Sequence, residues 1–140
     1  MTEHVFEGPN WYRSRIRRFG PVLALVLPAL MGAIALGALN FADGTASGAT
    51  GLIFGVCAAP GLLVMGAPLE SGDLVRVGGI AMSVVLWLIV GVIATRVATR
   101  NPVASFTDYW RAYRWLAAGV IVGVLAALGA SALLVDQSLL

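Results

Sequence analysis

The chain has 140 residues, of which 59% are hydrophobic and 11% are charged, and its formal net charge is +2. Soluble globular proteins carry about 25% charged residues, and a chain this small and apolar could not hide its surface from water. The composition therefore predicts an integral membrane protein of one domain, and the small net charge gives no reason to expect a nucleic-acid partner.

Residues 1–19 form a polar and basic segment ahead of the first apolar stretch. Its aromatic side chains include Trp11 and Tyr12, and such rings favour the headgroup level of a bilayer. Arginines followed by an apolar run also resemble a secretory signal peptide. However, the run over residues 20–39 is longer than the roughly 7–15 residues of a signal core, so we expect a retained first span.

Four apolar stretches are long enough to cross a bilayer, whose core of about 30 Å requires roughly 20 helical residues. They cover residues 20–39, 48–69, 74–95 and 115–135. Backbone polar groups in lipid must bond internally, so we expect each stretch to be a helix. The predicted fold is an all-α integral membrane protein whose residues 20–140 form a transmembrane domain of about four helices.

An amphipathic segment precedes the last stretch. An Asn-Pro pair at positions 101 and 102 is typical of a helix start. From there the apolar and aromatic side chains fall on one face, while Asp108 and Arg111 lie off that face. We therefore expect residues 102–114 to form an interfacial helix that leads into the fourth span.

The arginines bear on the orientation in the membrane. Four spans place five arginines on the side of the amino terminus and four on the other side, so the positive-inside rule hardly discriminates. If residues 48–69 were re-entrant, only Arg76 would lie opposite the other eight arginines. Four spans remain our preferred prediction because the stretch is long and uncharged, and dual topology is a third possibility. We expect a cell-membrane protein with a cytoplasmic amino terminus.

Small residues spaced four apart predict where helices pack, because helices in lipid associate by close approach. The two clearest rows lie in the second and fourth stretches, and their members are Gly51, Gly55, Ala59, Gly119, Gly123 and Ala127. The third stretch has a similar row of Gly79, Ser83, Trp87 and Gly91. Pro28 and Pro60 lie inside the first two stretches, where they should free the carbonyls of Ala24 and Val56 and kink the helices.

The sequence offers few groups that could carry chemistry. Its one histidine, His4, lies in the amino-terminal segment, and its one cysteine, Cys57, lies in the middle of the second stretch. A bis-histidine haem and a multi-cysteine metal site both need more ligands than that. We therefore expect no catalytic residue, no metal site, no bound cofactor and no enzymatic activity.

Plentiful packing rows and scarce chemical groups favour a structural or accessory subunit of a larger membrane complex, with a respiratory or other energy-converting complex as one candidate. The expected partners are other integral membrane subunits and the lipid bilayer. The residues we expect at a partner or headgroup contact are Trp11, Tyr12, Arg13, Arg17, Trp110 and Arg111. The alternative is a small homo-oligomeric transporter or channel for a neutral solute, a lipid or a quinone.

Overall fold

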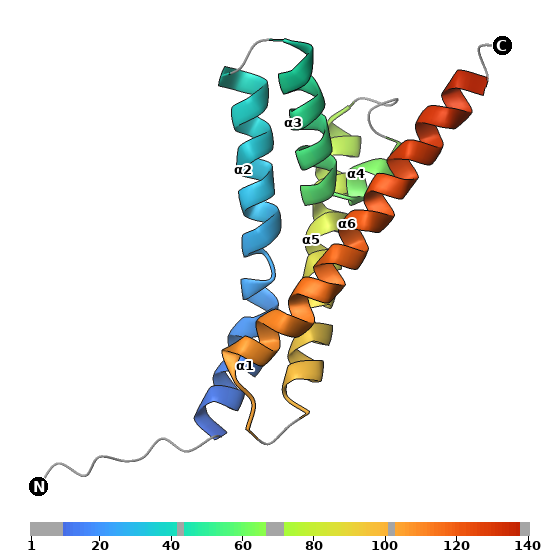
Figure 1. Ribbon diagram of the computed structural model, residues 1–140. Coiled ribbons are helices and arrows are strands. Elements are labelled where there is room, and N and C mark those ends of the chain that lie inside the picture. Colours follow the sequence, from blue (N-terminus) through green and yellow to red (C-terminus); the bar gives the residue numbers. More distant parts are fainter. Residues whose placement is uncertain (1–9, 42–43, 67–71, 101–102, 138–140) are drawn as a thin grey trace, which may run out of the picture.

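The computed structural model describes residues 10–41, 44–66, 72–100 and 103–137, and within these ranges the regular structure is entirely helical. Figure 1 shows the six helices in chain order. They are α1 (Asn10–Leu23), α2 (Val26–Phe41), α3 (Thr45–Ala58), α4 (Gly61–Val64), α5 (Asp73–Ala98) and α6 (Phe106–Gln137).

Within the described ranges, three helical segments are long and apolar enough to cross a membrane. The first is formed by α1 and α2 together, over Trp11–Phe41, with a short irregular step between them. The second is α5, over Asp73–Ala98, and the third lies in α6, over Phe106–Leu134. These segments contain the first and third stretches that the sequence predicts as spans, and all but the last residue of the fourth.

The second predicted stretch differs from the prediction, because it is not one continuous helix. The α3 helix ends at Ala58, and the four-residue α4 helix starts only at Gly61. Pro60 has no N–H to bond the carbonyl of Val56, and the Gly61 N–H donates to the Ser83 hydroxyl at 2.9 Å instead of continuing the helix. The 14 residues of α3 rise only about 21 Å, less than a bilayer core of about 30 Å.

The path of α3 and α4 can be followed along α5. The Ala58 carbonyl accepts a hydrogen bond from the Trp87 indole, which lies near the middle of α5. Gly61 then contacts Ser83, and the next residue, Leu62, packs on Gly79. The chain thus approaches the middle of α5 and then turns back toward the start of α5, at the end of the molecule where α3 also begins (Figure 1).

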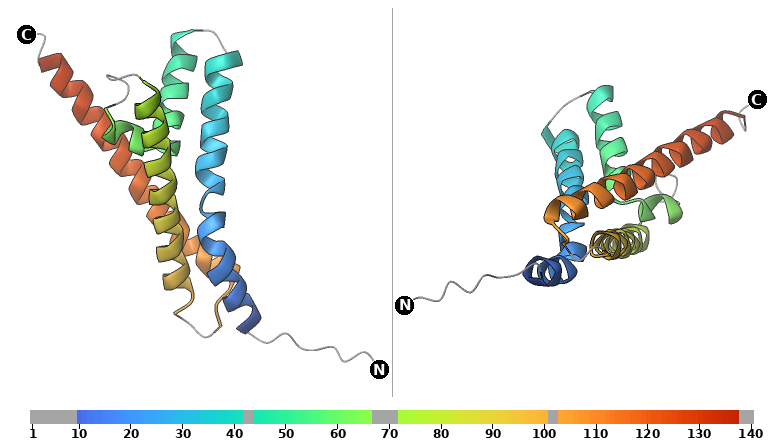
Figure 2. Two further views of the ribbon diagram at one scale, coloured as in Figure 1. Left: turned by 180° about the vertical axis from the view of Figure 1, so that it is seen from behind. Right: turned by 60° about the horizontal axis from the view of Figure 1, so that its bottom comes forward.

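The direction of α5 also differs from the four-span prediction. Gly20 lies against Thr95, and Ala24 lies against Gly91, so α1 and α5 run antiparallel. Four successive spans would make the first and third parallel. In Figure 2 the chain goes up through α1 and α2, down through α5 and up again through α6.

Residues 106–114 are the first turns of α6 rather than a separate interfacial helix. Ser105 caps the helix: its hydroxyl accepts from the Asp108 N–H at 3.3 Å, and the Asp108 carboxylate accepts from the Ser105 hydroxyl at 2.7 Å. The Asn-Pro pair at 101–102, which the sequence predicts as the helix start, lies outside the described residues.

The main core surrounds the step between α1 and α2, where α5 and α6 close over it. Its most deeply buried members are Ile16, Ala24, Trp87, Ala94 and Tyr109. A smaller cluster of Val56, Cys57 and Val124 joins α3 to α6. Beyond this crossing, α6 runs obliquely away from the other helices, as both views in Figure 2 show.

Candidate functional site

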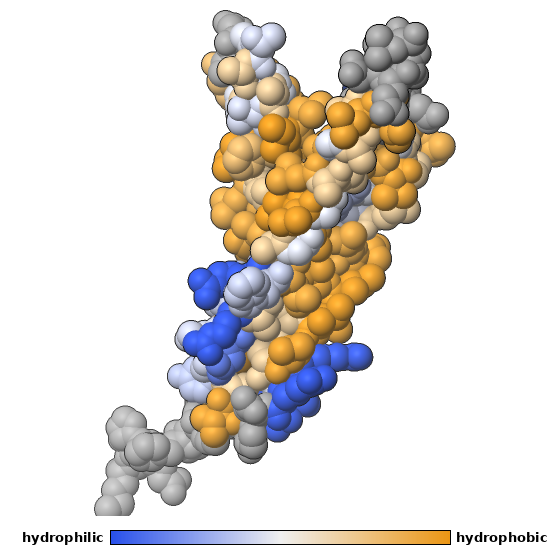
Figure 3. Space-filling model, turned by 45° about the vertical axis from the view of Figure 1, so that its right-hand side comes forward, coloured by the Kyte–Doolittle hydropathy of each residue, from blue (hydrophilic) through white to orange (hydrophobic). Residues whose placement is uncertain are grey.

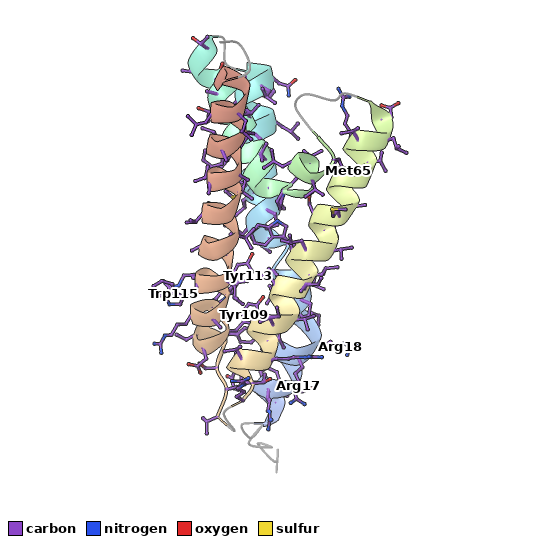
Figure 4. The ribbon with its side chains drawn as sticks, turned by 90° about the vertical axis from the view of Figure 1, so that its right-hand side faces the viewer. Arg17, Arg18, Met65, Tyr109, Tyr113 and Trp115 are labelled. Atoms are coloured by element: carbon purple, nitrogen blue, oxygen red, sulfur yellow. The ribbon has the colours of Figure 1, made fainter. Side chains whose placement is uncertain are left out.

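Two tyrosines from α6 hold the step between α1 and α2. Pro28 cannot donate to the carbonyl of Ala24, and the Tyr113 hydroxyl donates to that carbonyl at 2.7 Å. The Tyr109 hydroxyl donates in the same way to the carbonyl of Gly20. The two rings stack at 6.0 Å, and Figure 4 shows them pointing into the bundle while Trp115 points away from it.

The small-residue row of α5 is a contact surface along most of its length. Gly79 and Ser83 meet α4, Trp87 bonds to the end of α3, and Gly91 touches Pro21 and Ala24. The row continues to Thr95, which lies against Gly20. A methyl group at Gly79 or Gly91 would push the neighbouring backbone away, so the row fixes how closely α4 and α1 approach α5.

The predicted row in α3 lies against α2. A methyl group on Gly51 would meet Leu39 at 2.6 Å, and one on Gly55 would meet Ala35 at 3.7 Å. Ala59 follows the end of α3, as its half-buried C-terminal cap. The row therefore includes two residues of the α2–α3 hairpin and one at the break before α4.

The predicted row in α6 lies in a different environment. Gly119, Gly123 and Ala127 are all exposed, and no described atom outside the neighbouring turns of α6 lies within 4 Å of where a methyl group on either glycine would sit. At the same spacing of four, the row extends toward the start of α6 through Trp115 and Arg111, both exposed. We call the five residues Arg111, Trp115, Gly119, Gly123 and Ala127 the α6 ridge.

The six residues predicted as partner or headgroup contacts do not form one site. The Trp11 and Tyr12 rings meet edge to face at 5.0 Å, and the Arg15 guanidinium covers the Trp11 ring at 4.0 Å. Trp110 packs edge-on against Tyr109 and Tyr113, whereas Arg111 belongs to the α6 ridge. The remaining two, Arg13 and Arg17, line a groove elsewhere on the surface.

That groove lies between α1 and α5 and has a volume of about 480 Å³. Arg13 and Arg17 form one wall, and Arg96 and Arg100 form the other. Thr95, Thr99, Pro21 and Val92 complete the lining. We call it the arginine groove. The sequence shows each arginine pair at a spacing of four, but only the antiparallel packing of α1 and α5 brings the two pairs together.

The charged end of the molecule is separate from its apolar body. In Figure 3 hydrophilic surface gathers around the lower part, where α1, the end of α5 and the start of α6 lie, and apolar surface covers the middle. Such a division is what a bilayer boundary requires of a spanning helix bundle.

Comparison of the sequence with protein-family models and with curated proteins, and of the structure with solved structures, gives no match.

Proposed function

We propose that this chain is a non-catalytic structural or accessory subunit of a membrane complex and docks on another integral membrane chain through the α6 ridge. The observation that carries the proposal is the open surface at Gly119 and Gly123, where no described atom outside the neighbouring turns of α6 lies within 4 Å of an added methyl group. Small residues offer lipid little contact, but they let a second helix approach closely. Only 11% of the most apolar stretch of α6 is buried, against 33% for α5.

The ridge has the composition of a helix interface anchored at one membrane boundary. Arg111 and Trp115 stand at its base, and Trp115 is 79% exposed. Tryptophan and arginine are the side chains most enriched among the residues that dominate interface binding energies. The non-catalytic part of the proposal rests on the sequence, whose single histidine and single cysteine lie far apart in the chain.

We further propose that the chain crosses the membrane three times and that residues 45–64 form a re-entrant hairpin covered by α2, α5 and α6. The turn at Ala59 and Pro60 and the antiparallel course of α1 and α5 support this topology. It places eight arginines on the side of the amino terminus and Arg76 alone on the other. By the positive-inside rule, the amino terminus is then cytoplasmic and the carboxyl terminus is outside.

The docking proposal is tested by Gly123→Ile, with Gly129→Ile as the matched control. Both glycines are exposed residues of α6 with open space around them, and they lie roughly 120° apart at about 100° per residue. Because an added Cβ at either position meets no described atom outside the neighbouring turns of α6, the two changes should affect the stability of the isolated chain to a similar, small extent. Gly123→Ile should abolish co-purification of the partner chains in mild detergent, whereas Gly129→Ile should leave it intact.

If Gly123→Ile leaves the co-purifying chains in the same ratio, the ridge faces lipid and the docking proposal is wrong. A chain that purifies only with copies of itself points to the second candidate, a small homo-oligomeric transporter or channel for a neutral solute, lipid or quinone. The break at Ala59 and Pro60 favours that candidate, because transporters bind substrates at broken helices near the membrane midplane. Flux through liposomes that Pro60→Ala changes would establish it.

A further inference from the structure

The arginine groove holds four like charges at close quarters. Arg13 and Arg17 lie one helical turn apart on α1, Arg96 lies in the last turn of α5, and Arg100 lies two residues past the end of that helix. Like charges four apart within a helix, such as Arg13 and Arg17, are destabilising, and here Arg96 and Arg100 add two more positive charges to the same groove. Figure 4 shows Arg17 at the lower end of α1, beside the end of α5. An anion between the pairs would relieve this repulsion.

No described carboxylate neutralises the four arginines. Among the residues whose side chains the structure describes, the acidic ones are Asp73 and Asp108. Asp73 begins α5 at the far end of that helix, and Asp108 is bonded to Ser105 at the start of α6. Neither lines the groove. The charge of the described part of the groove is therefore open to a ligand.

The guanidinium groups are the donors that the groove can offer a ligand. The Thr95 hydroxyl donates to the Gly91 carbonyl at 2.7 Å, and the Thr99 hydroxyl donates to the Thr95 carbonyl at 2.8 Å. The threonines therefore have no proton to offer a ligand, and the guanidinium groups must supply the hydrogen bonds. The Nε of Arg13 is buried and has no hydrogen-bond partner within the described structure. A buried donor without an acceptor is costly, so a small shift of the Arg13 side chain toward an acceptor in the groove would be favourable.

The position of the groove selects the kind of anion. Its inner end is closed by Pro21 and Val92, which are apolar, and its outer end is basic. In the topology proposed above, this is the cytoplasmic boundary of the membrane, where basic pockets between spanning helices meet lipid headgroups. Guanidinium groups bind phosphate oxygens in a bidentate manner. We propose that the arginine groove binds the phosphate of an anionic phospholipid, whose acyl chains extend past Val92 along the apolar surface of α5.

The test is a titration of the full chain in detergent with dioctanoyl phosphatidylglycerol, followed by native mass spectrometry and by the melting temperature. Dioctanoyl phosphatidylcholine serves as the neutral lipid and inorganic phosphate as the free anion. The variant is R17Q/R96Q, and the matched control is R15Q/R114Q. The control also removes two arginines, but Arg15 and Arg114 line other surface depressions and not the arginine groove. It therefore lowers the net charge equally and leaves the groove intact.

The proposal predicts one bound phosphatidylglycerol per chain. R17Q/R96Q should weaken this binding about thirtyfold, which corresponds to about 1 kcal/mol per arginine, and R15Q/R114Q should change it little. Without lipid, R17Q/R96Q should raise the melting temperature, because it relieves like-charge repulsion. R17K/R96K keeps the charge but loses the planar fork, so its affinity should fall between those of the wild type and R17Q/R96Q.

Three outcomes would overturn the proposal. Equal weakening by R17Q/R96Q and R15Q/R114Q would show diffuse attraction of the basic end to anionic lipid. Saturable binding of inorganic phosphate as tight as that of phosphatidylglycerol would identify a site for a free anion. A lower melting temperature of R17Q/R96Q without lipid would show that the arginines already have anionic partners within the chain.

Discussion

Tyr113→Phe removes the hydrogen-bond donor that holds the step between α1 and α2. The Ala24 carbonyl receives a hydrogen bond from the Tyr113 hydroxyl at 2.7 Å, and Pro28 cannot supply the helical one. Phenylalanine keeps the ring and its packing, so the loss is confined to one buried acceptor. Leaving a buried acceptor without a partner costs about 1–3 kcal/mol, and this is the expected fall in unfolding free energy. The measurement is reversible unfolding in mixed micelles with increasing SDS.

Tyr109→Phe is the internal control for this prediction. Its hydroxyl bonds the Gly20 carbonyl, which also accepts from the Ala24 N–H at 3.1 Å and so keeps a partner when the hydroxyl is lost. The expected cost is about 0.5–1.5 kcal/mol, below that of Tyr113→Phe. Pro28→Ala restores a donor at position 28, so its effect and that of Tyr113→Phe should not be additive. Equal costs for the two tyrosines, together with additivity in that cycle, would refute the reasoning.

Two further substitutions test the contacts of α5. Trp87→Phe removes the indole donor to the Ala58 carbonyl at 3.0 Å, so it should destabilise the chain by about 1–3 kcal/mol. It should also speed hydrogen exchange at the backbone amides of Ala59 and Gly61. Unchanged exchange at these amides would show that the break between α3 and α4 does not need this hydrogen bond. Gly91→Ala places a methyl group 2.7 Å from the Pro21 Cα, so it should lower the unfolding free energy by about 1–3 kcal/mol in the same assay. The control Gly37→Ala adds a methyl group in open space and should be neutral or stabilising. Equal effects of the two substitutions would mean that α1 and α5 do not pack as described.

The sequence predicts the helical class and the three long apolar segments of the structure, because a continuous apolar run of sufficient length is a local property of the sequence. It does not predict that the second stretch breaks. The run over residues 48–69 is uncharged, and a proline inside a spanning helix usually causes only a kink. The helix ends here because the Gly61 N–H bonds to Ser83, which is 22 positions away in the sequence. The sequence did contain one signal of the break. Its arginines fit the positive-inside rule better if residues 48–69 are re-entrant than if they cross the membrane.

The arginine groove and the tyrosine contacts depend on the same topology. In a four-span arrangement α1 and the third span run parallel, which would place Arg96 and Arg100 at the opposite side of the membrane from Arg13 and Arg17. Their meeting could therefore not be predicted together with four spans. The Tyr109 and Tyr113 hydroxyls bond to carbonyls 89 positions away, and no local pattern encodes such a pairing. The freed carbonyl of Ala24 was predictable from Pro28, but its partner was not.

The three-span topology with a re-entrant hairpin is tested most directly by the accessibility of single cysteines in intact cells. Thr45→Cys, at the start of α3, and Thr107→Cys, at the start of α6, are made in a Cys57→Ala background, and both positions are exposed. A membrane-impermeant maleimide should label Thr45→Cys from outside, and it should label Thr107→Cys only after the membrane is permeabilised. Labelling of both positions from the same side would contradict the topology and support four spans.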